Sequence, residues 1–452
     1  MVPHRTPSRR SGRLLLSGLA LTAATSLLQP AGAASASPKP APQEYLVAAD
    51  PAAKEVYVYR TSDMRRTGHL DDVVLGAHVG TVQLPDGRLL MVDDAHAKVL
   101  AVKISSKGKP TVVGSAAIPA RIPWQRAAWA AVDKNHQYLA VSSDYEGAAS
   151  QTITLVNLKS FATKQITVPL KPTSAGTYGE AQVYLAGDPL QVVVTTGEEF
   201  TSFPVAPILA GQSPAATSTA PLGANHHGPV VSRTGNRVFS TTADGLDGAA
   251  LPGATLTQPV SVTYSHTRNV IQNFRPRLAA DNATIWGVAT EDTGLDATQW
   301  ADTRNDVSII NTTSLRSDLV RLPDGSPNLR FALSAKYGAV TVANPEGDTL
   351  SLIDTAPRSS TYKRLVGVVA LPSLSGGPVA GTAVTGTQAR FTTLTSSGDR
   401  AYVSQGGEGK ILVIDTGSRA IQKSVSAPTS LTGGGYLTVV KTGTPLSDLI
   451  AR

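Results

Sequence analysis

One pattern of apolar and polar positions recurs along this chain: two apolar runs flank a turn that is rich in Asp, Asn and Gly. The clearest copy joins residues 337–344 (YGAVTVAN) to residues 349–354 (TLSLID), and another joins 398–404 (GDRAYVS) to 410–415 (KILVID). Alternation such as VYVY at 56–59 has a period of two, which is typical of β-strands. Each copy therefore predicts a β-hairpin.

Six more copies precede these two. Four are compact and run over 45–59, 89–104, 138–158 and 192–205, and two with long turns run over 237–262 and 285–310. The copies begin about 44 to 63 residues apart, close to the ~40–50 residues of a propeller blade. The sequence predicts an all-β fold: a single β-propeller of four-stranded blades over residues 44–445. Eight blades are expected, with seven as the alternative if the two long-turned copies are misread.

A last apolar run near the C-terminus has no partner in its own hairpin. Residues 435–440 (GYLTVV) could supply the innermost strand of the first blade, which begins abruptly at Tyr45. Such pairing would close the ring and remove its last exposed sheet edge. Residues 446–452 are then a short C-terminal tail.

The N-terminus has the pattern of an export signal. Arg5, Arg9, Arg10 and Arg13 precede an apolar stretch from 14 to 28, and small residues follow at 31–36. We expect a signal peptide over residues 1–33, removed on export, and a flexible linker over 34–43. The pair Arg9-Arg10 leaves the Sec and twin-arginine routes both open. The predicted location is outside the bacterial cytoplasm, secreted or in the cell envelope, with no later segment long enough to span a membrane.

Composition excludes several classes of function. The chain has no cysteine, which rules out a thiolate nucleophile and any Cys-ligated metal. Its formal net charge of +7 includes the four arginines of the signal, so the mature charge is small and a nucleic-acid partner is not expected. The common motifs of serine hydrolases, P-loop proteins and HExxH metalloproteases are missing. We expect a monomer, and the missing motifs favour a non-enzymatic protein while leaving a metal-dependent hydrolase open.

Two resemblances to known families follow from these repeats. The unit at 342–354 resembles the repeat of YVTN-type, surface-layer-like bacterial propellers. The opening run 44–59 (EYLVAADPAAKEVYVY) and the Gly179-Glu180-Ala181 step resemble the periplasmic zinc metallochaperones that serve zinc ABC importers, which are also propellers. Those proteins carry a histidine-rich loop after the second hairpin, whereas residues 105–110 (SSKGKP) contain no histidine here. Tyr178 also stands where a histidine is expected before Gly-Glu.

Blade geometry indicates where a site could lie. In a four-stranded antiparallel blade, the link into the innermost strand and the turn between the second and third strands lie on the same face of the ring, which we call the channel face. Aligned positions on this face supply imidazoles and carboxylates, which suit zinc or another divalent cation. The metal candidates are His78, His226, His227, Glu180, Asp93, Asp94 and His96. Equivalent positions carry arginines that could hold a small anionic ligand: Arg126, Arg275 (or Arg277), Arg330 and Arg390.

Structural roles compete with these assignments. Asp50, Asp144, Asp244 and Asp292 recur at hairpin turns, where Asp commonly accepts hydrogen bonds from its own backbone. Glu198 and Glu199 are adjacent, so they should point to opposite sides and not act together. His69 and His266 are expected to lack acidic neighbours at ligand spacing.

Three functions remain open from sequence alone. The first is a secreted, non-enzymatic propeller that binds a metal ion, with zinc as one candidate, or a small anionic ligand on the channel face. The second is a lactonase-like hydrolase that uses a bound divalent cation to activate water. The third is a cell-surface platform that binds another extracellular protein.

Overall fold

The computed structural model describes residues 43–75, 81–119, 127–143, 147–179, 181–264, 270–279, 281–291, 301–327, 331–374 and 390–442, with the backbone alone at 127–128, 270–275 and 327. Contacts divide the chain into Met1–Ala41 and Pro42–Arg452, and the second unit carries the fold. None of the helices in these described residues is long and apolar enough to cross a membrane.

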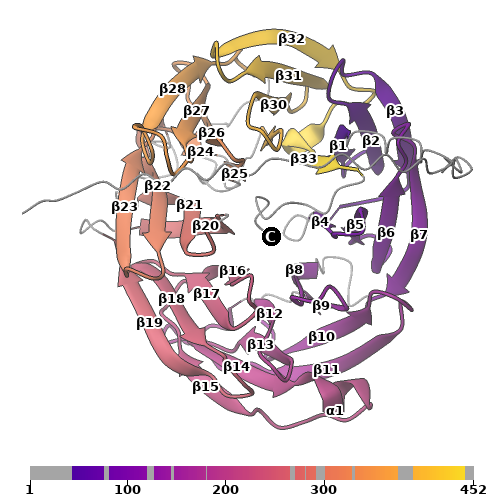
Figure 1. Cartoon of the computed structure of the whole chain (residues 1–452), viewed down its shortest axis with the longest axis vertical. Coiled ribbons are helices and arrows are strands. Elements are labelled where there is room, and N and C mark those ends of the chain that lie inside the picture. The colour runs from indigo at the N-terminus through magenta and orange to yellow at the C-terminus, as the bar shows by residue number, and fades with distance from the viewer. Residues whose placement is uncertain are drawn as a thin grey trace, which may run out of the picture. The chain divides into compact units, whose positions relative to one another are not determined.

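The described strands form eight antiparallel sheets in a ring, so the protein is an eight-bladed β-propeller (Figure 1). Each blade is given from its innermost to its outermost strand. Blade 1 contains β33 (Tyr436–Lys441), β1 (Glu44–Asp50), β2 (Glu55–Arg60) and β3 (Arg66–Asp71). Blade 2 contains β4 (Thr81–Gln83), β5 (Arg88–Asp93), β6 (Lys98–Ile104) and β7 (Pro110–Ala117). Blade 3 contains β8 (Ala127–Val132), β9 (Tyr138–Ser143), β10 (Ser150–Asn157) and β11 (Thr163–Pro169). Blade 4 contains β12 (Val183–Ala186), β13 (Gln191–Thr195), β14 (Glu199–Pro204) and β15 (Ser218–Pro221).

The other four blades follow in chain order. Blade 5 contains β16 (His227–Val231), β17 (Arg237–Thr241), β18 (Gly245–Ala250) and β19 (Thr257–Thr263). Blade 6 contains β20 (Val270–Leu278), β21 (Thr284–Glu291), β22 (Asn305–Asn311) and β23 (Arg316–Arg321). Blade 7 has its inner strand in two pieces, β24 (Ser326–Pro327) and β25 (Ala332–Leu333), which both pair with β26 (Tyr337–Ala343), followed by β27 (Thr349–Asp354) and β28 (Leu365–Ala370). Blade 8 contains β29 (Thr392–Leu394), β30 (Arg400–Gln405), β31 (Lys410–Asp415) and β32 (Ala420–Ser426).

The C-terminal strand closes the ring, as the sequence predicted. β33 pairs antiparallel with β1, with Ala48 opposite Leu437 and Leu46 opposite Val439. In Figure 1 the yellow β33 lies beside the indigo β1 near the centre of the ring. Blade 1 is therefore built from both ends of the chain, and the inner edge of β1 is paired.

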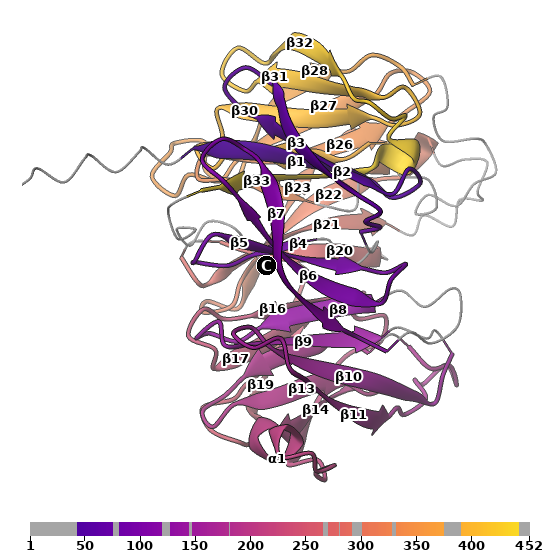
Figure 2. The same ribbon diagram turned by 90° about the vertical axis from the view of Figure 1, so that its right-hand side faces the viewer.

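The core lies between neighbouring blades rather than in one central mass. The side chains of β2 alternate: Val56 and Val58 join the cluster that contains Leu89 of blade 2, whereas Tyr57 and Tyr59 join the cluster that contains Tyr402 of blade 8. Both faces of the strand are thus buried, which explains why the run VYVY carries no polar residue. Seen from the side, the strands run across the thickness of the ring, so one layer of blades makes up its depth (Figure 2).

The hairpin turns confirm one structural expectation. Asp50 Oδ1 accepts hydrogen bonds from the backbone N–H groups of Ala52 and Ala53 at 3.1 and 3.3 Å, and its Oδ2 accepts one from Leu431 at 2.8 Å. The carboxylate thus holds its own turn and ties it to the closing segment. Asp144 and Asp292 lie outside the described residues.

The structure differs locally from the sequence-based interpretation in two places. The copy over 237–262 does not have a long turn, because β17 and β18 are separated by only three residues and the later apolar run is the outer strand β19. The sequence analysis did not predict the short helix α1 (Val205–Leu209), which follows β14 directly and begins where the predicted hairpin ends. It lies at the outer edge of the ring beside β11 (Figures 1 and 2).

Candidate functional site

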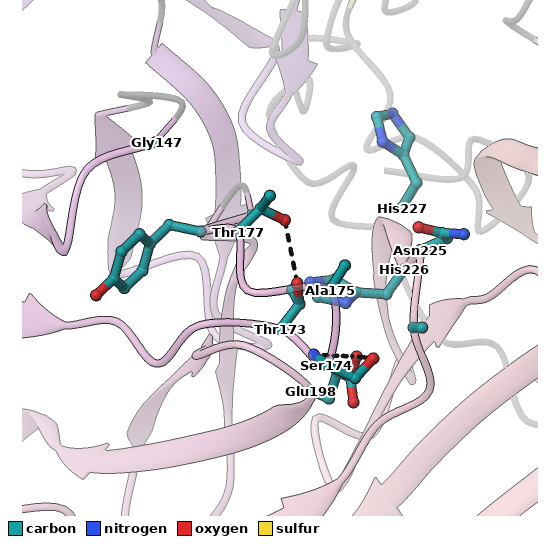
Figure 3. A pocket seen from close by; sticks show the side chains of 12 residues that line it. Gly147, Thr173, Ser174, Ala175, Thr177, Glu198, Asn225, His226 and His227 are labelled. Carbon is teal, nitrogen blue, oxygen red and sulfur yellow. Dashed lines mark hydrogen bonds between the residues drawn. The ribbon is translucent and has the colours of Figure 1, made fainter.

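A pocket of about 750 Å³ opens on the channel face across blades 3, 4 and 5. Its walls come from four loops that are distant in sequence. They are the turn of blade 3 that carries Gly147, the link Thr173–Gly179 into blade 4, the turn of blade 4 that carries Glu198, and the link that ends in His226 and His227 (Figure 3). The described lining residues are Gly147, Thr173, Ser174, Ala175, Thr177, Tyr178, Gly179, Glu198, Ala224, Asn225, His226 and His227.

The link into blade 4 is itself a hydrogen-bonded turn. The backbone N–H of Thr173 donates to the carbonyl of Thr177 at 2.7 Å, and the two hydroxyls lie 3.1 Å apart. Gly176 has a φ of +77°, a left-handed conformation that glycine adopts without strain. These contacts fix the loop that faces the pocket.

Glu198 is held in one orientation by this loop. Its Oε1 accepts hydrogen bonds from the Ser174 backbone N–H at 2.9 Å and the Ser174 hydroxyl at 2.6 Å. The turn can approach so closely because Gly197 has a φ of +68° and its missing Cβ would lie 2.9 Å from the Lys171 carbonyl. Hydrogen bonds from Ser174 hold the pKa of Glu198 below its usual value, with a smaller contribution from the nearby His226. The side chain is therefore a carboxylate under ordinary conditions.

The two histidines of the next link point in different directions. Figure 3 shows His226 directed toward the 173–177 loop, and His227 directed away from it. The His227 ring packs edge-on against Trp129, with centroids 5.0 Å apart, and its carbonyl accepts a hydrogen bond from the Thr241 hydroxyl. Asn225 and Gly228 on either side have φ of +52° and +93°, so the backbone turns sharply through this pair. His226 therefore shares the pocket wall with Glu198, while His227 contacts the inner strand of blade 3.

The charge of the pocket distinguishes between a cation and an anion. Its described lining contains one carboxylate, two imidazoles and no lysine or arginine. A carboxylate that stays ionised repels anions and attracts cations. The electrostatics of this lining favour a cationic ligand.

Asp93 and His96 are brought together, but in another blade. In the 93–97 turn of blade 2, His96 Nδ1 lies 2.8 Å from Asp93 Oδ2, and His96 Nε2 lies 3.2 Å from Asp72 Oδ2. Asp93 Oδ1 accepts a hydrogen bond from the Val74 N–H, and the Asp94 N–H donates to the Val74 carbonyl. Both imidazole nitrogens thus face carboxylates, an arrangement that ties blade 2 to the link from blade 1.

Two of the candidate arginines have described side chains. Burial lowers the pKa of the Arg277 guanidinium in β20, with an opposing contribution from Tyr436. Arg390 is buried in an ion pair. Arg390 Nε and Nη2 lie 2.8 and 2.7 Å from Asp348 Oδ2, and Nη2 also donates to the Pro372 carbonyl. The guanidinium is only 3% exposed. This geometry connects blades 7 and 8.

His78, Glu180, Arg126 and Arg330 lie outside the described residues, and of Arg275 only the backbone in β20 is described. In sequence, Glu180 directly follows Gly179, which lines the pocket.

Sequence reasoning missed the two residues that define the pocket. Glu198 and Ser174 are 24 positions apart and meet only because the blade 4 turn folds against the link. The expectation that Glu198 and Glu199 diverge agrees with their contacts, since Glu199 pairs with Lys171 at 2.5 Å. The polar run TSAGTYG at 173–179 was the available signal, because a long link on the channel face is where a loop site can form.

The fold defines the class of protein, an eight-bladed β-propeller. No protein-family model and no curated protein matches the sequence. Among solved structures, the chain is similar to the dihydro-heme d1 dehydrogenase NirN, with a TM-score of 0.55 and 16% identity over 85% of this chain and 73% of that chain. It is also similar to two structures of AztD from Citrobacter koseri, with TM-scores of 0.57 and 0.58, identities of 13% and 14%, and 88% and 89% of this chain against 98% and 99% of theirs. At these identities the likeness is one of fold.

Proposed function

We propose that this protein is a secreted, non-enzymatic binding propeller that captures a divalent cation, with zinc as the first candidate, in the pocket of blade 4. Glu198 and His226 would supply ligands, and the predicted ligand Glu180 is the third. Imidazole nitrogen and carboxylate oxygen are donors that zinc takes in proteins. The resemblance of residues 44–59 and 179–181 to zinc metallochaperones, noted from sequence, supports the same choice of metal.

One observation carries the proposal: an oriented carboxylate shares the pocket wall with His226. Ser174 restrains Oε1 of Glu198 through two hydrogen bonds, so the orientation of the carboxylate exists before a cation arrives. A ligand that is already oriented loses less conformational entropy on binding. The pocket is also formed by loops rather than by the buried core, which suits a site that must load and release its ion.

Electrostatics separate this function from anion binding. The described pocket lining offers no cationic side chain, and Arg390 is engaged with Asp348. A small anion at this wall would meet the negative charge of Glu198, and the described lining contains no lysine or arginine that would compensate it.

The test is zinc titration of the full mature chain, purified without a histidine tag, by calorimetry and by metal analysis after dialysis. Glu198→Gln removes the charge while keeping the shape, and His226→Ala removes the imidazole. Each variant should lower zinc affinity at this site by more than ~10-fold, since loss of a group that only orients a ligand already costs ~10–100-fold. Ser174→Ala removes a hydroxyl that only orients Glu198, so this variant should lower zinc affinity by ~10–100-fold.

Glu199→Gln is the matched control, because its carboxylate is adjacent in sequence but pairs with Lys171 instead. This variant should bind zinc as the wild type does. If Glu198→Gln and His226→Ala both retain wild-type affinity, the pocket is not the zinc site and the proposal fails.

A further inference from the structure

Three metal-ligating side chains meet at the outer rim of blade 1, far along the ring from the blade 4 pocket. Glu55 begins β2 and lies directly opposite Asp71 at the end of β3, and His69 lies two residues before Asp71. Side chains two apart on a strand lie on the same side of the sheet. Glu55, His69 and Asp71, here called the rim cluster, therefore share one face at the channel-face end of the blade.

The donor atoms of the rim cluster are close enough for one ion. One ligand atom from each residue lies within 4.8 Å of the other two. His69 Nε2 is 3.1 Å from Asp71 Oδ1. The sequence expectation that His69 lacks acidic neighbours is thus wrong, because the i, i+2 spacing of a strand brings Asp71 beside it.

A second observation concerns the deepest oxygen of the cluster. Oε2 of Glu55 is shielded from solvent, and no described hydrogen-bond donor reaches it. A buried carboxylate oxygen without a hydrogen-bond donor lowers the stability of the folded state, and a bound cation would provide the missing partner. His69 and Asp71 are 51% and 70% exposed, so an ion could enter from the solvent side while Glu55 binds it from below.

Glu55 and Asp71 lie opposite each other on β2 and β3, and a bound cation would remove the repulsion between their negative charges. Like charges directly opposite each other on neighbouring strands destabilise a sheet. Lys54 lies toward Asp72, at 4.0 Å, and the guanidinium of Arg66 lies over the Tyr57 ring at 5.9 Å from its centroid. Among the described residues, neither Lys54 nor Arg66 forms an ion pair with Glu55 or Asp71.

We propose that the rim cluster is a second cation site, in which Glu55, His69 and Asp71 bind one divalent transition metal ion. One imidazole and two carboxylates suit zinc and its neighbours among the first-row metals, whereas calcium and magnesium prefer oxygen ligands alone. The site is independent of the pocket of blade 4, because none of its residues belongs to that pocket.

The experiment counts zinc ions bound by the full chain after equilibrium dialysis, and compares single and double variants. His69→Ala should lose one zinc ion per chain relative to wild type, and Asp71→Asn should weaken the same site by more than ~10-fold. Both residues are exposed, so the variants should fold. Asp318→Asn is the matched control: this aspartate also lies on an outermost strand, is 56% exposed and pairs with Lys363 at 2.8 Å. Its zinc stoichiometry should not change.

A second readout is the thermal stability. Zinc should raise the melting temperature of Glu198→Gln through the rim cluster, and the increase should vanish in Glu198→Gln combined with His69→Ala. Unchanged zinc stoichiometry in His69→Ala, with zinc lost only on Glu198→Gln, overturns the rim site and leaves the pocket intact. Zinc lost on His69→Ala but retained by Glu198→Gln supports the rim site and rejects the proposed function.

Discussion

Leu46 lies directly opposite Val439, where the first strand of the chain pairs with the last strand of the propeller. Both side chains are buried, and both belong to the cluster that packs blade 1 against blade 8. This pair is one point in the seam that converts an open row of eight sheets into a ring.

We predict that a chain ending at Ala427 will not form a stable propeller. It lacks β33 and with it the buried side chains Leu437, Val439 and Val440, each worth ~1.5–3 kcal/mol of burial against a typical total stability of ~5–15 kcal/mol. Circular dichroism during heating should show a weak or absent cooperative transition. A chain ending at Thr442 keeps the whole strand and should unfold like the wild type. If both truncated chains melt alike, closure is not what stabilises the ring.

We predict that a side chain at position 338 destabilises the folded protein. The absent Cβ of Gly338 would lie 2.0 Å from the ring of Phe331, which stacks on Trp286 with centroids 6.0 Å apart. Gly338→Ala should therefore destabilise the protein by ~1–3 kcal/mol, the usual cost of overpacking. Urea unfolding measures this loss. Gly253→Ala is the control, because its Cβ would come no closer than 3.9 Å to a described atom, and a similar loss in both variants would argue against a clash.

The buried ion pair of Arg390 and Asp348 should be important for stability. Asp348→Asn removes the carboxylate that pairs with this guanidinium, which is 3% exposed, and breaking such a buried pair costs ~3–5 kcal/mol. The exposed pair Lys363–Asp318 provides the comparison, since Asp318→Asn should cost less than ~1 kcal/mol. Denaturant midpoints for the two variants should differ accordingly. Equal midpoints would show that Arg390 is accessible to water, as a ligand-binding arginine would need to be.

Acid should remove a stabilising contribution from Asp281. Burial alone would raise the pKa of this carboxyl, but hydrogen bonds from the Thr284 hydroxyl and from the Ala283 and Thr284 N–H groups outweigh burial and lower it. A lowered pKa in the folded state means stability that is present above the unfolded value, ordinarily 3.8, and that is lost as the pH falls through the folded pKa.

Asp281→Asn should therefore be less stable than wild type by ~1–2 kcal/mol at pH 7, and the difference should shrink toward pH 2. Urea midpoints of both proteins at several pH values check this. A difference that stays constant with pH would show that the carboxylate charge contributes nothing.

The blades could be predicted from sequence because the two middle strands of a blade are buried on both sides, as β27 and β31 are, although outermost strands such as β32 are largely exposed. Buried strands require apolar runs such as TLSLID and KILVID, and such runs are easily recognised in the sequence. Eight hairpins could be counted from them. β18 escaped because its sequence, GLDGAA, relies on glycine: the absent Cβ of Gly248 would lie 2.3 Å from Phe239, so close packing replaces a hydrophobic side chain there. α1 escaped because VAPIL is as apolar as a strand and only its place after β14 distinguishes it.

The site was less predictable because it is made by tertiary contacts. The two histidines at 226–227 were found from the alignment of blades, but Glu198 depends on a link in another part of the chain. A turn carboxylate has no sequence signal that separates it from the many that only hold their own backbone, as Asp50 does.

The closing strand also sets the order in which the molecule can be completed during biosynthesis. β3 ends at Asp71, and the partner that β1 needs begins at Tyr436. At ordinary rates of translation, on the order of tens of seconds separate the two. Throughout that interval the inner edge of β1 presents unpaired N–H and C=O groups. Blade 1, although made first, is then the last blade to be finished, and it is the place where β33 of a second nascent chain could insert by mistake.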